Sequence, residues 1–310
     1  MKLSTLRHTV RIVAAAALLT VLGTAPAGAA DGWQKVGSDA RSGVSGLAYE
    51  GPAADGRGVS TLIVHDNKAT GQPRLSRLIH RESGPDDVTP MTWTGAEPSD
   101  LEAIEAIPGM PGEYLALAAR GIVYRLRVSG RTATVADYAP LPAIGRGDDY
   151  ESFALVSRSG SLIALWADRG AGADRPATLY SAPLTFARWG QPQFGTVTRR
   201  AYRAPYPTGG ETRHISDISV PDSGRILVSS AADAGDDGPF DSAVTDAGRV
   251  TVSSTGQVRI TLAASATLLG RFPGYKIEAV ECVPGSAQAL LGTDDENVGG
   301  HVRTMPYCAS

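Results

Sequence analysis

The sequence lacks the features that mark several large classes of protein. After residue 30 it has no apolar run near the roughly 20 residues that cross a bilayer. It has no cluster of Lys and Arg of the kind that neutralises nucleic-acid phosphates. Its two cysteines have no matching histidine pattern, which excludes a zinc site. We therefore expect no membrane span and no nucleic-acid partner.

Familiar catalytic and nucleotide-binding motifs are also missing. The chain has no G-x-S-x-G elbow, no H-E-x-x-H pair and no glycine loop that would cradle a phosphate. Among the histidines, His214 is the best candidate for acid–base chemistry, because it precedes Asp217 at the start of an expected strand. A histidine held in a hydrogen bond at the rim of a site is the alternative.

Residues 1–30 have the pattern of a secretory signal peptide. A basic start precedes an apolar run at 12–23 and the small-residue stretch "TAPAGAA", so we expect cleavage near Ala29 or Ala30. This segment carries three basic and no acidic side chains, and its removal lowers the net charge from −3 to about −6. We expect a secreted, extracellular monomer with a single domain over 31–310 and no membrane attachment.

Cys282 and Cys308 lie near the C-terminus of a chain that we expect to be exported. Disulfides persist in oxidising compartments, so the two cysteines are expected to pair. Such a bond would close a loop of about 26 residues and fasten the C-terminal tail to a strand.

The apolar segments are short and are bounded by turn residues, which indicates an all-β protein. Examples are "STLIVHD", "EYLALAA", "SLIALWAD" and "GRILVSS", separated by turns such as "PGMPG", "SRSG" and "PDSG". Glycine (36) and proline (20) are abundant, and amphipathic helical runs with caps at both ends are absent.

A repeat predicts the architecture. One landmark in each unit is followed by a turn and a second apolar strand, with spacings of 56, 49, 66 and 61 residues between Gly46, Glu102, Glu151, Asp217 and Glu278. This period is typical of β-propeller blades. We expect five blades, with six as the alternative if one lies in the longer gaps. The segment "GWQKVGS" should add an outer strand beside "GGHVRTMP", so that both chain ends close the last blade.

The recurring carboxylates should meet at the propeller axis. Glu102, Glu151 and Glu278 hold equivalent positions, each two residues before an apolar side chain, on strands expected to line the channel. In the fourth unit either Asp217 or Ser216 takes this position, and Gly46 in the first unit would leave room. The expected acidic set is Glu102, Glu151, Asp217 and Glu278.

Three interpretations of this convergence stay open. The acids could bind calcium, which takes six to eight oxygen ligands. They could form an acid–base pair, as in glycoside hydrolysis. They could instead pair with basic residues such as Arg213, Lys276 or Arg146, or with backbone amides at the starts of strands.

Further acids follow the second strand of several units and are candidates for the rim of the same site. They are Asp66, Asp168, Asp233 and Asp294. The stretch "DAGDDG" at 233–238 is partly similar to a calcium loop, although Gly235 and Val244 stand where ligands are expected. Solvated turns are the alternative for all of these acids.

The stretches "SGLAYE", "DLEAIEAIPG" followed by "EYLALAARG", and "VSSAADAGDDGPFDSAV" resemble the phytase-like propeller family of secreted bacterial proteins, also described as esterase-like. In that family acidic channel residues hold calcium ions that bridge to substrate phosphates. The resemblance implies this role for Glu102, Glu151 and Glu278. The chain shows five units where these phytases have six blades, and no dense group of Lys and Arg beside the acids.

Two classes of function follow from these observations. The first is a secreted, calcium-dependent hydrolase acting on a phosphoester or another ester. The second is a non-catalytic propeller that binds a small-molecule ligand, phosphorylated or not, or a protein partner, with calcium in a structural role. Fold alone does not choose between them.

Overall fold

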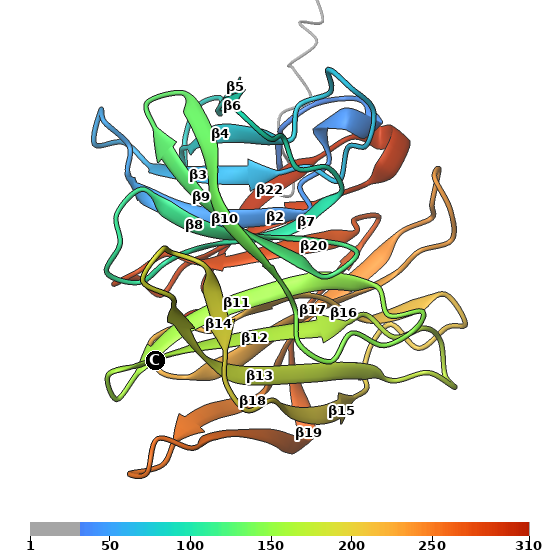
Figure 1. Cartoon of the computed structure of the whole chain (residues 1–310). Helices are drawn as coiled ribbons and strands as arrows, with labels where there is room; N and C mark the ends of the chain where they lie inside the picture. Colours follow the sequence, from blue (N-terminus) through green and yellow to red (C-terminus); the bar gives the residue numbers. More distant parts are fainter. Residues whose placement is uncertain (1–31, 310) are drawn as a thin grey trace, which may run out of the picture. The chain divides into compact units, whose positions relative to one another are not determined.

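The described residues of the computed structural model, 32–309, form five β-sheets of four or five strands each (Figure 1). Their helical segments are two short 3-10 helices, η1 (Ala40–Ser42) and η2 (Glu296–Val298). Within this part of the chain no helix is long and apolar enough to cross a membrane. The expected signal peptide at 1–30 lies outside the described residues.

The sheets follow one another along the chain as blades. Blade 1 contains β2 (Gly46–Pro52), β3 (Val59–Val64), β4 (Leu75–His80) and β5 (Asp87–Pro90). Blade 2 contains β7 (Leu101–Ala106), β8 (Glu113–Ala118), β9 (Ile122–Ser129), β10 (Thr132–Pro140) and β6 (Thr92–Thr94), the last parallel to β10. Blade 3 contains β11 (Tyr150–Arg158), β12 (Ser161–Asp168) and β13 (Ala177–Phe186), with β14 (Pro192–Phe194) and β15 (Thr198–Tyr202) both pairing with β13. Blade 4 contains β16 (Thr212–Ser219), β17 (Arg225–Ala232), β18 (Asp241–Val252) and β19 (Val258–Pro273). Blade 5 contains β20 (Ile277–Cys282), β21 (Ala289–Thr293), β22 (His301–Met305) and β1 (Gln34–Lys35).

The first long strand of each blade lies innermost, and these five strands form a closed ring. They contact one another in the order β2, β7, β11, β16, β20, and β20 contacts β2 again. In Figure 1 the blue β2 and the red β20 accordingly lie close together. The chain is therefore a five-bladed β-propeller, as the repeat predicts, and the six-blade alternative is wrong.

The two ends of the described chain close the ring in one blade. β1 pairs antiparallel with β22, with Gln34 opposite Val302 and Lys35 opposite His301. The adjacent Trp33 stacks on Tyr275 with ring centroids 4.4 Å apart. The predicted closure by N- and C-terminal strands is confirmed, and it gives the outer edge of β22 a partner.

Apolar side chains alternate along the strands and pack between blades. Most of the buried apolar residues of the described chain fall into five clusters, one at each junction between neighbouring blades. At the junction of blades 1 and 2, for example, Leu62 and Val64 pack with Leu101 and Ile104. Each fully buried Leu, Ile or Val side chain contributes about 1.5–3 kcal/mol. Packing between the blades therefore holds the inner strands around one axis.

Gly46 is required by the close approach of two blades. A Cβ at this position would lie 2.8 Å from the Cα of Ala103 and 3.0 Å from the amide nitrogen of Ile104 in β7. The expectation that Gly46 leaves room in the channel is therefore wrong, because the backbone of blade 2 already fills that space.

Cys282, at the end of β20, forms a disulfide with Cys308, and their Cα atoms are 5.7 Å apart. The bond fastens the C-terminal tail to the inner strand of blade 5. The predicted pairing is confirmed.

We expect reduction of this disulfide to lower the free energy of unfolding by about 3 kcal/mol, because opening a loop of 26 residues restores entropy to the unfolded chain. Urea unfolding with and without reductant measures the effect. The double variant Cys282→Ala/Cys308→Ala is the control and should not respond to reductant. Equal midpoints for the oxidised and reduced protein would contradict this expectation.

Candidate functional site

A polar cavity of about 320 Å³ lies where the five inner strands converge. Every blade contributes to it. Its walls carry eight carboxylates and five basic side chains, and the lining is Asp66, Lys68, Asp100, Glu102, Ala119, Arg120, Asp149, Glu151, Arg169, Arg213, Lys276, Glu278, Asp294 and Glu296. We call this space the polar cavity.

Three of the acids predicted to converge do so. Glu102 of β7, Glu151 of β11 and Glu278 of β20 all line the polar cavity, because each occupies the same position near the start of an inner strand. Glu151 and Glu278 are each only 7% exposed. Charged carboxylates so deeply placed need compensation.

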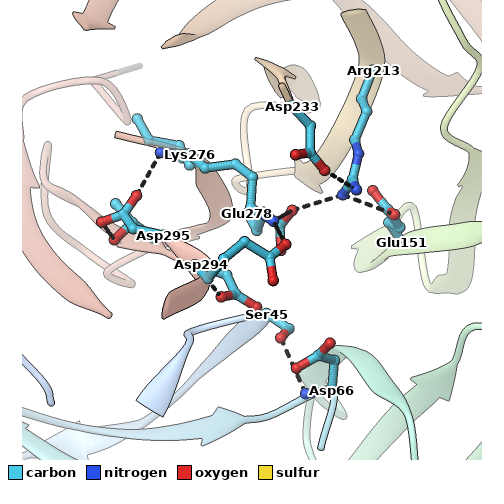
Figure 2. A network of polar contacts seen from close by, with 12 residues as sticks. Ser45, Asp66, Glu151, Arg213, Asp233, Lys276, Glu278, Asp294 and Asp295 are labelled. Carbon is cyan, nitrogen blue, oxygen red and sulfur yellow. Dashed lines mark hydrogen bonds and ion pairs between the residues drawn. The ribbon is translucent and has the colours of Figure 1, made fainter. Parts of the chain in front are cut away.

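Basic side chains compensate two of these three acids. Arg213 lies between Glu151 and Glu278, with Nη1 at 3.3 and 3.0 Å from their Oε1 atoms (Figure 2). Arg169 also pairs with Glu151, and Lys276 Nζ lies 3.1 Å from Glu278. This arrangement corresponds to the interpretation in which the channel acids pair with Arg and Lys.

The carboxylates hold these cations charged in spite of burial. Burial by itself lowers the pKa of Lys276, but Glu278, Asp294 and Glu296 together more than offset this effect, and the pKa is raised. The pKa of Arg213 is raised in the same way, against its burial, chiefly by Glu151 and Glu278. The result is a buried network in which opposite charges stabilise one another.

Three other acids of the cavity have no basic partner among residues 32–309. They are Asp66, Glu102 and Asp294. Burial raises the pKa of all three, and repulsion from the other acids raises it further: from Glu151 for Glu102, and from Glu278 for Asp66 and Asp294. Lys276 offsets part of this rise for Asp66 and Asp294, as Lys68 does for Asp66. The carboxylate of Asp294 rests against Gly43, where a Cβ would lie 2.3 Å from it.

The expectation of no dense basic group beside the acids is wrong. The structure brings together Lys68, Arg120, Arg169, Arg213 and Lys276 around the cavity. They come from five separate segments, so no cluster is visible along the chain. Their position in the repeat could have identified three of them. Lys68, Arg120 and Arg169 each follow the second strand of a blade, as Asp66 and Asp294 do.

Asp217, the fourth predicted acid, does not line the polar cavity. The register of β16 shifts between Arg213 and Asp217, which brings Arg213 into the cavity and turns Asp217 toward blade 5. There Asp217 Oδ2 accepts a hydrogen bond of 2.7 Å from the amide of Val280. An irregularity inside a strand displaces every later side chain. The repeat showed this unit only as ambiguous between Asp217 and Ser216, and neither residue lines the polar cavity.

Asp217 belongs to a second set of acids that link neighbouring blades through backbone amides. Glu105 of blade 2 accepts from the amide of Leu155 in blade 3. Glu281 Oε1 of blade 5 accepts from the amide of Tyr49 in blade 1 at 2.8 Å. Glu105 and Glu281 line a different cavity, of about 660 Å³, toward the other end of the inner strands. The second acid of "DLEAIE" is therefore bound to the neighbouring blade.

Two of the four acids predicted at the rim line the polar cavity, and two do not. Asp66 and Asp294 line the polar cavity. Asp233 does not line it, but pairs with Arg213 from outside. Asp168 instead accepts three hydrogen bonds from the Arg175 guanidinium and one of 3.1 Å from the amide of Asp149.

His214 is a structural residue. Its ring is buried, with Nε2 donating to the carbonyl of Gly172 at 2.7 Å and Nδ1 accepting from the amide of Ala204 at 3.2 Å. Both nitrogens are engaged, and the side chain does not line the polar cavity. The hydrogen-bonded ring agrees with the alternative interpretation, and the acid–base role of His214 stays a prediction that its place outside the polar cavity does not support.

No family model matches this chain, and no curated protein matches it. Among solved structures it is similar to the WD40 β-propeller domain of Doa1, at 12% identity and a TM-score of 0.39, over 89% of this chain and 97% of that one. We base the propeller assignment on the five sheets and the closed ring of inner strands in this chain.

We expect the protein to lose stability as the pH rises from about 4.5 to 8. Burial raises the pKa of Glu281 to about 8 from an ordinary 4.5, so the folded state holds a proton that the unfolded chain releases. The contribution of this proton to the free energy of unfolding is fully present below pH 4.5. It decreases between pH 4.5 and pH 8, by up to about 1.4 kcal/mol per pH unit.

Urea unfolding at pH 5 and pH 8 measures this dependence. Glu281→Gln keeps an oxygen to accept from Tyr49 and should flatten the profile. Glu211→Gln, at an exposed position outside this cluster, is the matched control and should leave it unchanged. A profile for Glu281→Gln as steep as that of the wild type would refute the assignment.

Proposed function

We propose that this propeller binds a divalent cation of the calcium class in the polar cavity and, through it, a small phosphorylated or otherwise anionic ligand. The observation that carries the proposal is that Asp66, Glu102 and Asp294 line the cavity without a basic partner among residues 32–309. Five basic side chains surround the same cavity, yet none forms an ion pair with these three acids, and the pKa of each stays raised.

A hard cation suits these groups. Carboxylate oxygens are preferred calcium ligands, and a dication would relieve the repulsion that raises the pKa of all three acids. No aromatic residue is among the described residues lining the cavity, so the ring faces that recognise organic ammonium groups are missing there. The donor set therefore favours a metal cation.

Glu151 supplies a second, independent observation. Its Oε1 pairs with Arg169 and Arg213, whereas its Oε2 is buried and has no hydrogen-bond partner. A buried acceptor without a partner costs about 1–3 kcal/mol. A cation or its bound water in the cavity would remove that cost.

The ligand set differs from the one predicted from sequence. Glu151 and Glu278 are neutralised by Arg and Lys, and Asp217 faces blade 5, so the predicted quartet does not fit a cation. No three His, Cys, Asp or Glu side chains within 32–309 stand in a ready-made metal arrangement. In the proposal Asp66, Glu102 and Asp294 are the protein ligands, and the remaining oxygens come from water and the bound ligand.

An anionic ligand would find its partners at the edge of the cavity. Arg120 is exposed and has no ion pair among the described residues, and the Lys68 side chain is 67% exposed beside Asp100. The volume of about 320 Å³ is at the lower end of small-molecule sites. The resemblance to phytase-like propellers agrees with a phosphorylated ligand, and phosphoester hydrolysis would be the catalytic form of the proposal.

We expect calcium to bind to the purified protein, and Glu102→Gln and Asp294→Asn each to weaken binding by about tenfold or more, equivalent to about 1.4 kcal/mol. Isothermal titration calorimetry measures the affinity. Asp174→Asn removes an exposed acid that has no ion pair and should bind like the wild type. No calcium binding to the wild type, or equal affinity in all four proteins, would overturn the proposal.

We further expect hydrolysis of phosphomonoesters in calcium and its loss in excess chelator. A panel of phosphomonoesters, assayed by phosphate release with and without EDTA, tests this expectation. Calcium binding with no turnover on any substrate would identify a binding propeller. Turnover that survives chelation would contradict a calcium-dependent reaction.

A further inference from the structure

A chain of three hydrogen-bonded side chains lies at the junction of blades 1 and 5, outside the polar cavity. His80, at the end of β4, has Nδ1 2.9 Å from Asp86 Oδ2 and Nε2 2.8 Å from the hydroxyl of Thr304 in β22. His80 is 4% exposed, and the Asp86 side chain is 1% exposed. The three side chains therefore form one hydrogen-bonded line from carboxylate to imidazole to hydroxyl, in which the carboxylate and the imidazole are buried.

The partners determine where the protons lie. Asp86 Oδ1 accepts from the amide of Arg81 at 3.0 Å, so Asp86 acts as an acceptor on both oxygens. His80 Nδ1 must then donate to Asp86. In the neutral ring Nε2 is left to accept the hydrogen of Thr304 Oγ1. A hydroxyl, an imidazole and a carboxylate in this order form the arrangement that activates a hydroxyl nucleophile, and it is recognised by geometry and not by sequence order.

The hydroxyl-bearing residue, Thr304, lies beside a cavity. His80 and Thr304 both line a space of about 730 Å³ that shares no lining residue with the polar cavity. Val59 and Leu290 give it apolar walls, and Arg57 and Gln288 bring side-chain donors. Its size is that of a small-molecule site. If the hydrogen bond between His80 and Thr304 served only to join two blades, it would need neither the carboxylate of Asp86 on the other side of the imidazole nor a cavity beside the hydroxyl.

We propose that Thr304 is the nucleophile of a second site, which hydrolyses carboxylic esters with small acyl groups. Thr304 Oγ1 forms a bond to the acyl carbon while its proton passes to His80 Nε2. His80 gives that proton to the leaving alcohol as the ester C–O bond breaks. Water then attacks the acyl-threonine ester, His80 takes a proton from it, and Thr304 Oγ1 regains the proton as the acid leaves. Asp86 is a positioning residue that keeps Nδ1 protonated.

Covalent labelling tests the nucleophile directly. The intact wild-type protein is treated with a fluorophosphonate probe in EDTA, and peptide mass spectrometry locates the adduct. We expect the adduct on Thr304. In the same buffer we expect hydrolysis of p-nitrophenyl acetate, which separates this site from the calcium-dependent one. A failure of calcium binding would leave both results unchanged.

Variants then test the roles of the three residues. Thr304→Val should abolish labelling and ester hydrolysis, whereas Thr304→Ser, which keeps the hydroxyl, should retain both. His80→Gln should lower the hydrolysis rate by about 100-fold or more, because the general base is lost. Asp86→Asn should slow labelling while the unfolding midpoint of the protein shows that it is folded. Thr251→Val, at an exposed position in β18, is the matched control and should behave as the wild type.

Two results would overturn the proposal. One is the absence of an adduct on Thr304 in the folded wild-type protein, a result that does not depend on whether any variant folds. The other is ester hydrolysis by Thr304→Val at the wild-type rate. Either result would leave the three groups as a tie between blades 1 and 5.

Discussion

Each blade of this propeller is packed between two others, and the rest of the structure depends on that constraint. Five apolar clusters occupy the five junctions between blades, and the inner strands make a closed ring of contacts. A sheet with neighbours on both faces must be apolar on both faces in its middle strands. Polar side chains are therefore displaced to the ends of the inner strands. Equivalent positions of different blades meet there, whatever their charge.

Buried carboxylates that meet in this way repel one another and need partners. Two of the three sets of acids in this molecule have such partners. Arg213, Arg169 and Lys276 neutralise the first set of acids, Glu151 and Glu278. Backbone amides of the next blade satisfy the second set, Glu105, Asp217 and Glu281. The third set, Asp66, Glu102 and Asp294, forms no ion pair among the described residues, and it is the set to which we assign the cation. Within this set Asp294 Oδ1 accepts a hydrogen bond of 3.2 Å from the amide of Glu296.

Ring closure also explains why a second candidate site lies between the first and last blades. The ends of the described chain meet in blade 5, where β1 pairs with β22 and the disulfide fastens the tail to β20. Blade 5 then packs against blade 1, which brings Thr304 of β22 to His80 of β4 across 224 positions of sequence. The residues of both candidate sites are thus assembled by contacts between blades.

The sequence by itself determined the all-β class, the five blades, the closing strand and the disulfide. These follow from local periodicity, turn residues and cysteine count, which act over short stretches of chain. It also determined that Glu102, Glu151 and Glu278 meet, because the repeat places them at one position on the inner strands. Only the tertiary structure decided which partner each acid receives. A register shift turned Asp217 away, and five separate segments supplied the basic side chains. Pairing with Arg213 and Lys276 was one of the interpretations that the sequence left open. Partners fixed by packing between blades carry no local signal, so the sequence could neither choose this interpretation nor predict the meeting of His80 with Thr304.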